Sequence, residues 1–525
     1  MSSKKHDAVF QRLRELMGSR VRNDEAALNS YSSDQSIYRI RPLAVTFPRD
    51  IDDIASIVRL AAEEQVPVHP RSGGSGTAGG ALGPGIVVVF SKSGPLNRIV
   101  KIDDENCFID AGAAVLHDTL QQALRERGLF LPADPSSGGL CLFGGNIATK
   151  ASGPHALKHG SIDRYLLSVR FVTGDGTEVD TADSRSIPAK LAADIEGLGK
   201  KLPDDPKAVN VLRKRIGFKT ASGYNLFTFL REDSAEKTVA GHVAQLFAGS
   251  VGTLGVITGA VVRAERRVEG QGLTLLYFRF LREAGDAVLG IREMGVDAIE
   301  IVNHRTLELV RNARREIPVP GGRCHLLMVE YSGPDPDEWG ERIRGYVRKK
   351  GYELAAEPVS VTEETERENL WKVRKALLPL LRNAGQSKQA LSIVNDVGVP
   401  VEFLAPFIEN IEAVFDKHGL QAAIYGHAGN GNLHLRPFFD TKAANLTQLL
   451  KKVADEVYGT VFSYGGTVTG EHGMGLLRAP YLREEWGEKI YAYMKRVKQI
   501  FDPENVLNPD AMFTKRSVTD QLRQF

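Results

Sequence analysis

The segment Tyr425–Pro437, YGHAGNGNLHLRP, carries the most informative pattern in this sequence. The pair Asn430-Gly431 at its centre is a strong signal for a two-residue hairpin turn, because both turn positions favour positive φ. Pairing the two arms about this turn would place His427 directly opposite His434. Directly opposed residues share one face of a sheet, with their Cβ atoms roughly 5 Å apart. The sequence therefore predicts a hairpin that presents two imidazoles side by side.

A second short segment, GEHG at residues 470–473, adds an acid and a further histidine to this pair. With the carboxylate of Glu471, His427 and His434 would form a three-ligand metal site that leaves a position open for substrate. Successive side chains of an extended chain point to opposite faces. On that basis we expect Glu471 to hold the metal while its neighbour His472 serves as a base.

Three glycine-bearing segments precede the hairpin, at residues 70–80, 135–153 and 249–258. The first contains G-x-G-x-x-G, but further glycines and a proline follow at 80–85. No helix can begin there, so a Rossmann dinucleotide site is excluded. A glycine-rich loop can still present successive backbone N–H groups to an anion. Two such loops so close in the chain favour one long polyanionic ligand lying along both, and a merely flexible loop is the alternative.

Composition narrows the class of protein. A chain of 525 residues is too long to fold around a single hydrophobic core, so two or three domains are expected. A formal net charge of +2 provides no field for capturing nucleic acid. The cysteines, Cys107, Cys141 and Cys324, form no CxxC pair, which argues against a disulfide framework and against an iron–sulfur cluster held by this chain alone. No apolar run of about 18 residues occurs, so no transmembrane segment is expected.

The first residues, MSSKKHDAVFQRLRELMG, place apolar side chains at helical spacing between charges. A signal peptide would instead have an unbroken apolar core. We expect a cytoplasmic protein, with peripheral attachment to the inner face of the membrane through a partner as an open alternative.

The periodicity along the chain indicates an α+β architecture. We expect a helical lead-in over 1–40, a cofactor domain over 41–268, a substrate domain over 269–482, and a final helix and tail over 483–525 that return to the first domain. In the substrate domain, strands near 273–280, 298–302, 324–331 and 390–397 alternate with helices near 283–294, 335–350, 363–381 and 401–418. This alternation favours a ferredoxin-like layer with the helices on one sheet face.

These motifs together resemble a known family. The segments Arg71–Gly80, Gly144–Thr149 and Ser250–Thr258 are similar to the FAD-binding domain of the vanillyl-alcohol oxidase-like (PCMH-type) flavoproteins. The segments His427–His434 and Gly470–Gly473 resemble the D-2-hydroxyacid dehydrogenase branch, whose members oxidise D-lactate, glycolate or D-2-hydroxyglutarate. The resemblance covers roughly residues 40 to 512. It implies a two-subdomain PCMH-type FAD-binding domain followed by a ferredoxin-like α+β substrate (cap) domain.

The resemblance also implies which residues contact FAD. Relatives with covalent FAD often have a histidine just after the Gly-Gly pair of the first loop, where this chain has Ser75, so FAD is expected to be held non-covalently. The expected contacts come from the three glycine-bearing segments and the C-terminal tail: Arg71, Ser72, Gly73, Gly74, Ser75, Gly76, Thr77, Pro135, Gly139, Gly145, Asn146, Ala148, Gly252, Ile257 and Asn508.

The resemblance assigns roles in the reaction as well. His427, His434 and Glu471 match the metal ligands, with zinc favoured over manganese or iron(II), and His472 matches the catalytic base. Arg374 matches an arginine that clamps the substrate carboxylate. Arg436 departs from the asparagine of the 2-hydroxyglutarate enzymes. Because it shares a strand face with His434, we expect it to be a second cation facing the substrate, with a solvent-facing arginine as the alternative.

The chemistry of these groups agrees with oxidation of a D-2-hydroxyacid, with D-lactate favoured over D-2-hydroxyglutarate and glycolate. Electrons would leave to an iron–sulfur subunit, an electron-transfer flavoprotein, a quinone or a cytochrome. Two other functions stay open: a zinc hydrolase and a non-catalytic flavin-binding subunit. The sequence does not decide between a monomer and a homodimer.

Overall fold

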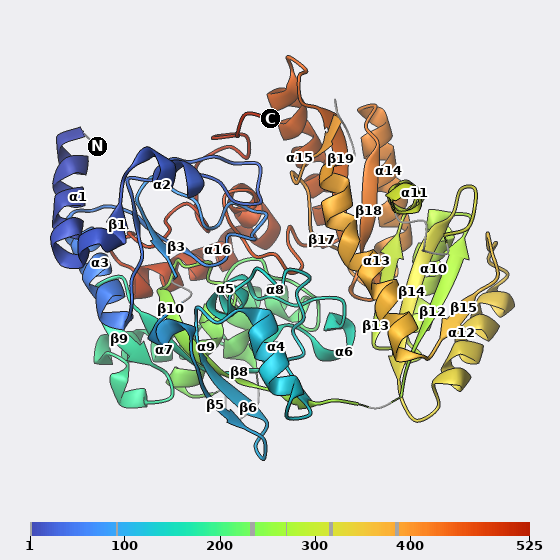
Figure 1. Cartoon of the computed structure of the whole chain (residues 1–525), viewed down its shortest axis with the longest axis horizontal. Coiled ribbons are helices and arrows are strands. Elements are labelled where there is room, and N and C mark those ends of the chain that lie inside the picture. The colour runs from blue at the N-terminus through green and yellow to red at the C-terminus, as the bar shows by residue number, and fades with distance from the viewer. Residues whose placement is uncertain (1–2, 91–92, 232–236, 269, 314–318, 384–387) are drawn as a thin grey trace.

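The computed structural model describes residues 3–90, 93–231, 237–268, 270–313, 319–383 and 388–525. Figure 1 shows two lobes: a first lobe of blue and green elements, and a second lobe of yellow and orange elements built on one large sheet. The last helix, α16 (Leu482–Phe501), returns to pack within the first lobe. In the part of the chain that the structure describes, no helix combines the length and the apolar character needed to cross a membrane.

A small mixed sheet lies at the N-terminal end of the first lobe. Its strand order is β1 (Val21–Arg22), β2 (Ala44–Thr46), β4 (Ile86–Val89), β3 (Val68–Arg71), and β2, β4 and β3 run parallel. The predicted helix after Asp50 is α3 (Ile51–Glu63). The Asp50 carboxylate accepts a hydrogen bond from the Asp53 amide at 3.0 Å, which satisfies one of the free N–H groups of the first turn. The first glycine-rich loop follows β3 directly.

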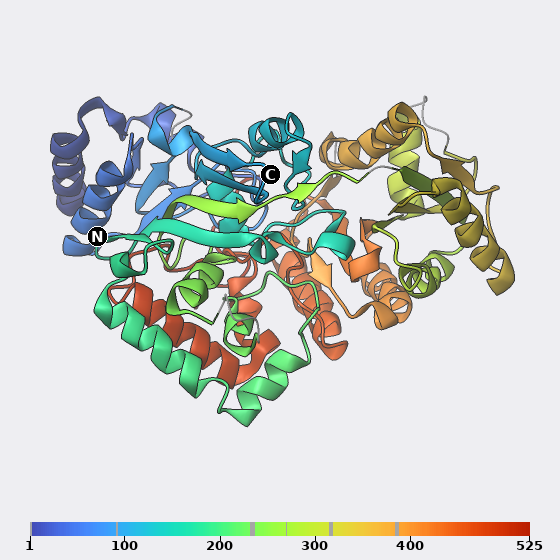
Figure 2. The same ribbon diagram turned by 90° about the horizontal axis from the view of Figure 1, so that it is seen from below.

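A five-stranded antiparallel sheet forms the rest of the scaffold. Its order is β5 (Ile99–Asp103), β6 (Phe108–Gly112), β10 (Val256–Arg263), β8 (Leu166–Val172), β9 (Glu178–Asp180). The remaining elements of the lobe are α1 (Ser3–Met17), α2 (Glu25–Ser30), α4 (His117–Arg125), α5 (Phe143–Thr149), α6 (Ala156–His159), α7 (Ala189–Lys201), α8 (Pro206–Arg213), α9 (Val239–Phe247), and the short pair β7 (Leu129–Phe130) and β11 (Glu265–Arg266). Figure 2 shows α7, α8 and α16 lying below this sheet.

One prediction for the first lobe is wrong. Residues 144–149, expected as part of a glycine-rich loop, form the helix α5. The two glycines allow close packing: a Cβ on Gly144 would lie 2.6 Å from the Ala113 Cβ, and one on Gly145 would lie 2.5 Å from the Ser72 Oγ. Tertiary packing thus overrides the low helix propensity of glycine here.

The second lobe is built on an eight-stranded antiparallel sheet. Its order is β15 (Val359–Val361), β12 (Gln271–Phe278), β14 (His325–Ser332), β13 (Ala298–Val302), β18 (Ala422–His427), β19 (Asn432–Asp440), β16 (Lys388–Ala390), with β17 (Val397–Gly398) also on β19. The helices are α10 (Leu281–Arg292), α11 (His304–Ala313), α12 (Pro336–Lys350), α13 (Glu364–Asn383), α14 (Leu404–Lys417) and α15 (Leu446–Ser463).

Helices cover both faces of this sheet, which corrects the expectation of one covered face. Leu276 and Val329 point into a core shared with α10, α12 and α14. Their neighbours Leu275 and Met328 point the other way, into a separate core with α11 and α13. The predicted strand 390–397 is also wrong. The chain between β16 and β17 leaves the ladder, and Asp396 takes a φ of 77° there. This excursion brings Asp396 to the site described below.

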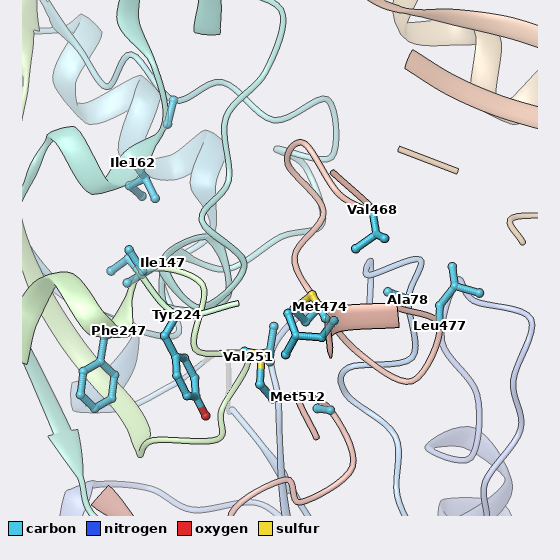
Figure 3. Close-up of a cluster of buried hydrophobic side chains, with 14 of the residues drawn as sticks. Ala78, Ile147, Ile162, Tyr224, Phe247, Val251, Val468, Met474, Leu477 and Met512 are labelled. Carbon is cyan, nitrogen blue, oxygen red and sulfur yellow. The ribbon is translucent and has the colours of Figure 1, made fainter. Parts of the chain in front are cut away.

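A buried apolar cluster supports the glycine loops of the first lobe. Figure 3 shows Ala78 and Val251, one from each of two glycine-bearing loops, close to Met474, Leu477 and Met512 of the C-terminal quarter. All five are less than one-tenth exposed. The C-terminal segment therefore helps to fix both loops.

Candidate active site

The histidine hairpin forms, but with a longer turn than predicted. Residues 428–431 connect β18 to β19, so His427 pairs with Asn432 and His434 pairs with Tyr425. The predicted direct opposition of the two histidines is wrong. Of the expected turn pair only Gly431 has a positive φ, 67°, and Asn430 ends a 3₁₀ turn. A type I′ turn would need both residues in that region.

The register shift nevertheless keeps both histidines on one face. Because side chains alternate with a period of two, only an odd shift would have moved them apart. The ring centroids of His427 and His434 lie 5.2 Å apart. The prediction of two neighbouring imidazoles is therefore confirmed, by a different pairing.

Glu471 completes a compact cluster of three metal-binding groups. Its Oε1 lies 2.9 Å from the His427 Nε2 and 3.4 Å from the His434 Nε2. One ligand atom from each residue lies within 4.8 Å of the others. Two imidazole nitrogens and one carboxylate oxygen suit a divalent transition metal. The donor set and its spacing therefore fit the metal that the resemblance implies.

His472 lies against the same cluster, not on an opposite face. Its Nε2 is 3.7 Å from the Glu471 Oε1, and its ring stacks on that of His434 with centroids 5.1 Å apart. The chain is not extended here, because the Asp396 carboxylate accepts hydrogen bonds from the backbone amides of both Glu471 and His472, at 3.2 and 2.9 Å. Because both amides bind the same carboxylate, the backbone bends there, and the side chains of Glu471 and His472 lie at the same site.

The electrostatics of the cluster follow from burial and from its ion pairs. Burial alone would raise the pKa of the Glu471 carboxyl, but His427 and Lys219 hold that pKa well below its usual range. Burial lowers the pKa of His472, and it lowers that of His434 to about 3. Neutral imidazoles are required for binding a metal and for accepting a proton. His434 and His472 meet this requirement at neutral pH. Burial would lower the pKa of His427 as well, but Glu300 and Glu471 raise it, so a bound cation would have to displace the proton from its Nε2.

Two residues that the sequence analysis did not identify, Lys219 and Ser152, hold Glu471 from the first lobe. The Lys219 Nζ donates to the Glu471 Oε2 at 2.8 Å, and the Ser152 Oγ donates to the same oxygen at 3.1 Å. The other carboxylate oxygen is left to face the histidines. No local sequence pattern distinguishes these two residues.

Glu300 on β13 is a third residue that the sequence analysis did not identify. Its Oε1 lies 2.5 Å from the His427 Nδ1, and its Oε2 accepts a hydrogen bond from the Arg374 Nε at 2.6 Å. Burial would raise the pKa of the Glu300 carboxyl, but His427 and Arg374 keep it lowered. An acid inside the apolar strand AIEIV was the signal in the sequence that could have identified it.

Both predicted arginines are buried beside this cluster. Arg374 lies with its guanidinium 5.0 Å above the Tyr425 ring, and its Nη2 has no hydrogen-bond partner within the described chain. The Arg436 Nη1 donates to the Ser392 Oγ at 2.6 Å, while its Nε lacks a partner among the described residues. Arg436 is only 3% exposed, so the alternative of a solvent-facing arginine is excluded.

A cavity of about 390 Å³ joins this cluster to the glycine loops. Twelve of the fifteen residues expected to contact a cofactor line it: Ser72, Gly73, Gly74, Ser75, Gly76, Thr77, Pro135, Gly145, Asn146, Ala148, Gly252 and Ile257. Arg374, Arg436, His434, Glu471 and His472 line its other end. A Cβ added to Gly76 would meet nothing within 4 Å, which shows open space directly above the loop. The cavity therefore fits an elongated ligand that reaches from the loops to the histidine cluster.

Three of the expected cofactor contacts, Arg71, Gly139 and Asn508, do not line the cavity. The Arg71 guanidinium points toward the N-terminal segment, where it donates to the Ser33 carbonyl at 2.8 Å. Asn508 lies behind the loops. Its Nδ2 donates to the carbonyls of Gly80 and Val251 at 2.7 Å each, so it joins the first loop to the third.

A second cavity, of about 510 Å³, lies between the lobes and shares Arg374 with the first. His155 of the first lobe lines this second cavity. The His155 Nδ1 is 2.6 Å from the Asp134 Oδ2, and its Nε2 is 3.0 Å from the Glu330 Oε1 of the second lobe. This imidazole therefore bridges the two lobes.

Comparisons with known proteins match both halves of the chain. Residues 42–182 match the FAD binding domain, and residues 270–512 match the C-terminal domain of FAD linked oxidases. D-2-hydroxyglutarate dehydrogenase from Escherichia coli (strain K12) is 31% identical over 91% of the chain. The alignment covers 49% of that protein, so the chain spans about half the length of this relative. D-lactate dehydrogenase from Archaeoglobus fulgidus is 28% identical over 93% of the chain and 96% of its own length.

Solved structures confirm the predicted fold class. The crystal structure of p-cresol methylhydroxylase with substrate bound superposes with a TM-score of 0.69, covering 98% of this chain and 97% of that one at 14% identity. At this identity the similarity shows the fold alone. The two-part architecture, a PCMH-type domain followed by an α+β domain, is therefore the one expected from the sequence.

Proposed function

Since the chain belongs to the FAD-linked oxidases, we propose that it oxidises a D-2-hydroxyacid to the corresponding 2-oxoacid. One observation carries this proposal. The cavity bounded by the glycine loops ends at a cluster that combines the candidate metal triad, a half-buried histidine with a lowered pKa and two arginines with unpartnered N–H groups. A hydroxyacid needs all three kinds of group: one for its hydroxyl oxygen, one for its proton and one for its carboxylate.

In this proposal the triad holds the hydroxyacid's reacting end. His427, His434 and Glu471 would bind a divalent cation, with Zn²⁺ favoured and Mn²⁺ or Fe²⁺ as alternatives. When bound, the cation supplies Lewis-acid polarisation of the hydroxyl, and FAD supplies hydride acceptance. Lys219 and Ser152 both donate to the Oε2 of Glu471. Glu471 would therefore supply only Oε1 to the cation, and other coordination positions would remain for the substrate.

His472 removes the hydroxyl proton. Its Nδ1 faces Asn395 and Asp396, and its Nε2 is directed to the cluster. Because burial lowers its pKa, the imidazole is unprotonated at neutral pH and able to accept a proton there. Transfer of the hydroxyl proton to Nε2 leaves negative charge on the hydroxyl oxygen. This charge favours loss of the α-hydrogen as a hydride.

Arg374 and Arg436 bind the carboxylate end of the substrate. A buried guanidinium with an unpartnered N–H is costly unless an anion completes it. Arg374 is already balanced by Glu300, whereas Arg436 forms no ion pair with any carboxylate of the described chain. D-lactate is the first substrate to test, with D-2-hydroxyglutarate and glycolate next. D-2-hydroxyglutarate stays in the series because the second arginine would also accommodate its distal carboxylate.

The proposal extends to the cofactor and the partner. Ser75 stands where covalent attachment would need a histidine, so FAD is held non-covalently. With three scattered cysteines, the electrons pass to a partner: an iron–sulfur subunit, an electron-transfer flavoprotein, a quinone or a cytochrome. We propose a cytoplasmic location, with attachment to the inner face of the membrane through that partner as the alternative. A homodimer is a separate part of the proposal. We assign residues 41–268 to FAD and 269–482 to the substrate.

Anaerobic flavin bleaching tests this function. The purified protein should be yellow, and its flavin absorbance should fall on adding one of the D-hydroxyacids, but not its L-enantiomer where one exists. Prior removal of metal with a chelator should prevent bleaching, and Zn²⁺ or Mn²⁺ should restore it. A colourless protein would favour the zinc hydrolase. A yellow protein that no 2-hydroxyacid bleaches would favour a non-catalytic flavin-binding subunit.

A further inference from the structure

Glu300 connects two parts of the site that are otherwise separate. It lies on β13 (Ala298–Val302), its side chain is fully buried, and its two oxygens have different partners. One oxygen lies 2.5 Å from the Nδ1 of His427 on β18, and the other accepts from the Nε of Arg374 on α13 at 2.6 Å. One carboxylate thus binds a metal-site histidine and a substrate-site arginine at once.

On the histidine side, Glu300 determines which nitrogen is available to a metal. A carboxylate that accepts from Nδ1–H keeps that proton on Nδ1, so Nε2 is the nitrogen that would bind a metal. That Nε2 is the atom directed to Glu471, at 2.9 Å. Without an acceptor at Nδ1 the His427 ring could rotate or change tautomer.

On the arginine side, Glu300 determines which nitrogen is available to an anion. The bond to Nε holds the guanidinium over the Tyr425 ring, at 5.0 Å. The Arg374 Nη2 is then left buried and without a partner in the described chain, on the wall of the cavity. Arg374 thereby keeps a fixed, unused donor for a carboxylate.

We propose that Glu300 is a positioning residue shared by the metal site and the substrate site, whose loss weakens both. This inference rests on the proposed function, because it takes the triad to bind a divalent cation and Arg374 to bind the hydroxyacid. It adds that the two sites are built on a single carboxylate, so they are lost together.

The chain offers a matched control in Glu330. It lies on the neighbouring strand β14, it is 5% exposed, and it pairs with Ala298, so it faces the same side of the sheet as Glu300. It also joins a histidine to α13, through His155 and Trp371. Neither of its partners belongs to the triad.

The test uses E300Q and E330Q in the FAD-loaded protein. Glutamine keeps the volume but loses the negative charge that faces both partners. Its amide also turns an N–H toward either His427 or Arg374 and leaves the other with only a neutral acceptor. Zn²⁺ dissociation constants are measured without substrate, by competition with a chromophoric chelator. We expect E300Q to weaken Zn²⁺ binding about 10- to 100-fold, the usual effect of removing such a partner. E330Q should stay within about threefold of the parent.

A second measurement isolates the arginine. At Zn²⁺ concentrations that saturate E300Q, its KM for the hydroxyacid that bleaches the parent should remain raised about tenfold or more, an increase of the kind expected when a charge-assisted hydrogen bond is lost. If E300Q does not accumulate as yellow protein, E300D replaces it. Aspartate keeps the charge but is one methylene shorter, so it should also bind Zn²⁺ more weakly than the parent.

The outcomes separate this inference from the proposed function. A parent that binds no Zn²⁺, or binds it equally well after H434A, contradicts the proposed metal site and this inference with it. A parent that binds Zn²⁺ in the triad, together with an E300Q that binds equally tightly, overturns only the role of Glu300. Equal losses in E300Q and E330Q would also overturn it, since the effect would then belong to the sheet and not to the shared carboxylate.

Discussion

Lys219 of the first lobe and Glu471 of the segment between α15 and α16 form a buried ion pair, with 2.8 Å between Nζ and Oε2. Their side chains are 5% and 11% exposed. This pair directs the other oxygen of Glu471 toward the histidines. The orientation of Glu471 in the proposed metal triad therefore depends on a residue that lies 252 positions away in the chain.

We expect K219M to impair the triad without removing the flavin. The methionine fills a similar volume but cannot donate, so the Glu471 Oε2 loses its strongest partner and the carboxylate can turn. Zn²⁺ affinity and the rate of flavin reduction should each fall about 10- to 100-fold, as measured by chelator competition and stopped-flow absorbance. K200M, which removes an exposed lysine paired with Glu196 on α7, is the control. Unchanged Zn²⁺ binding in K219M would contradict this role.

We expect H472A to separate proton transfer from binding. Alanine removes the base but none of the three triad ligands, so FAD and Zn²⁺ should be retained. Loss of a general base typically costs about 10²- to 10⁴-fold in rate, and flavin reduction should slow by that range. The check is single-turnover bleaching of protein whose flavin and zinc contents match the parent. Reduction at the parent's rate would refute the assignment of His472 as the base.

Site residues that belong to a local sequence pattern were easier to predict from the sequence than site residues whose contacts lie far away in the chain. The two hairpin histidines share a face in either register, since a shift of two positions preserves side-chain parity. Glu300 and Lys219 could not be placed at the site, because their contacts span 127 and 252 residues. The same holds for residues 391–396, where the backbone leaves the sheet so that Asp396 can bind the amides of Glu471 and His472.

Asn508 was expected to contact the cofactor, and its observed hydrogen bonds lead to a different prediction. Its side-chain amide donates hydrogen bonds to the Gly80 and Val251 carbonyls, and Asn508 does not line the cavity. N508A should strand two buried acceptors and lower the free energy of unfolding by about 1–3 kcal/mol. FAD should also dissociate more readily, because both loops lose their common support. Thermal unfolding and flavin fluorescence measure the two effects.

The control for N508A is N410A, which removes an exposed hydrogen bond to Tyr464. An N508A protein with normal stability and weakened FAD binding would instead indicate a direct contact with the cofactor.

The bridge between the lobes should make stability depend on pH. Burial would lower the pKa of His155, but Asp134 and Glu330 together raise it well above its usual value. The folded state therefore binds a proton that the unfolded state releases near its ordinary pKa of about 6.5. The stabilisation is fully present below that pH and is lost as the pH rises through the higher pKa of the folded state.

H155Q should be less stable than the parent at pH 6, and the difference should shrink as the pH is raised toward 9. Urea unfolding of both proteins across this range measures it, with H6Q on the exposed face of α1 as the control. A difference that stays constant with pH would show that His155 is not held as a cation between Asp134 and Glu330.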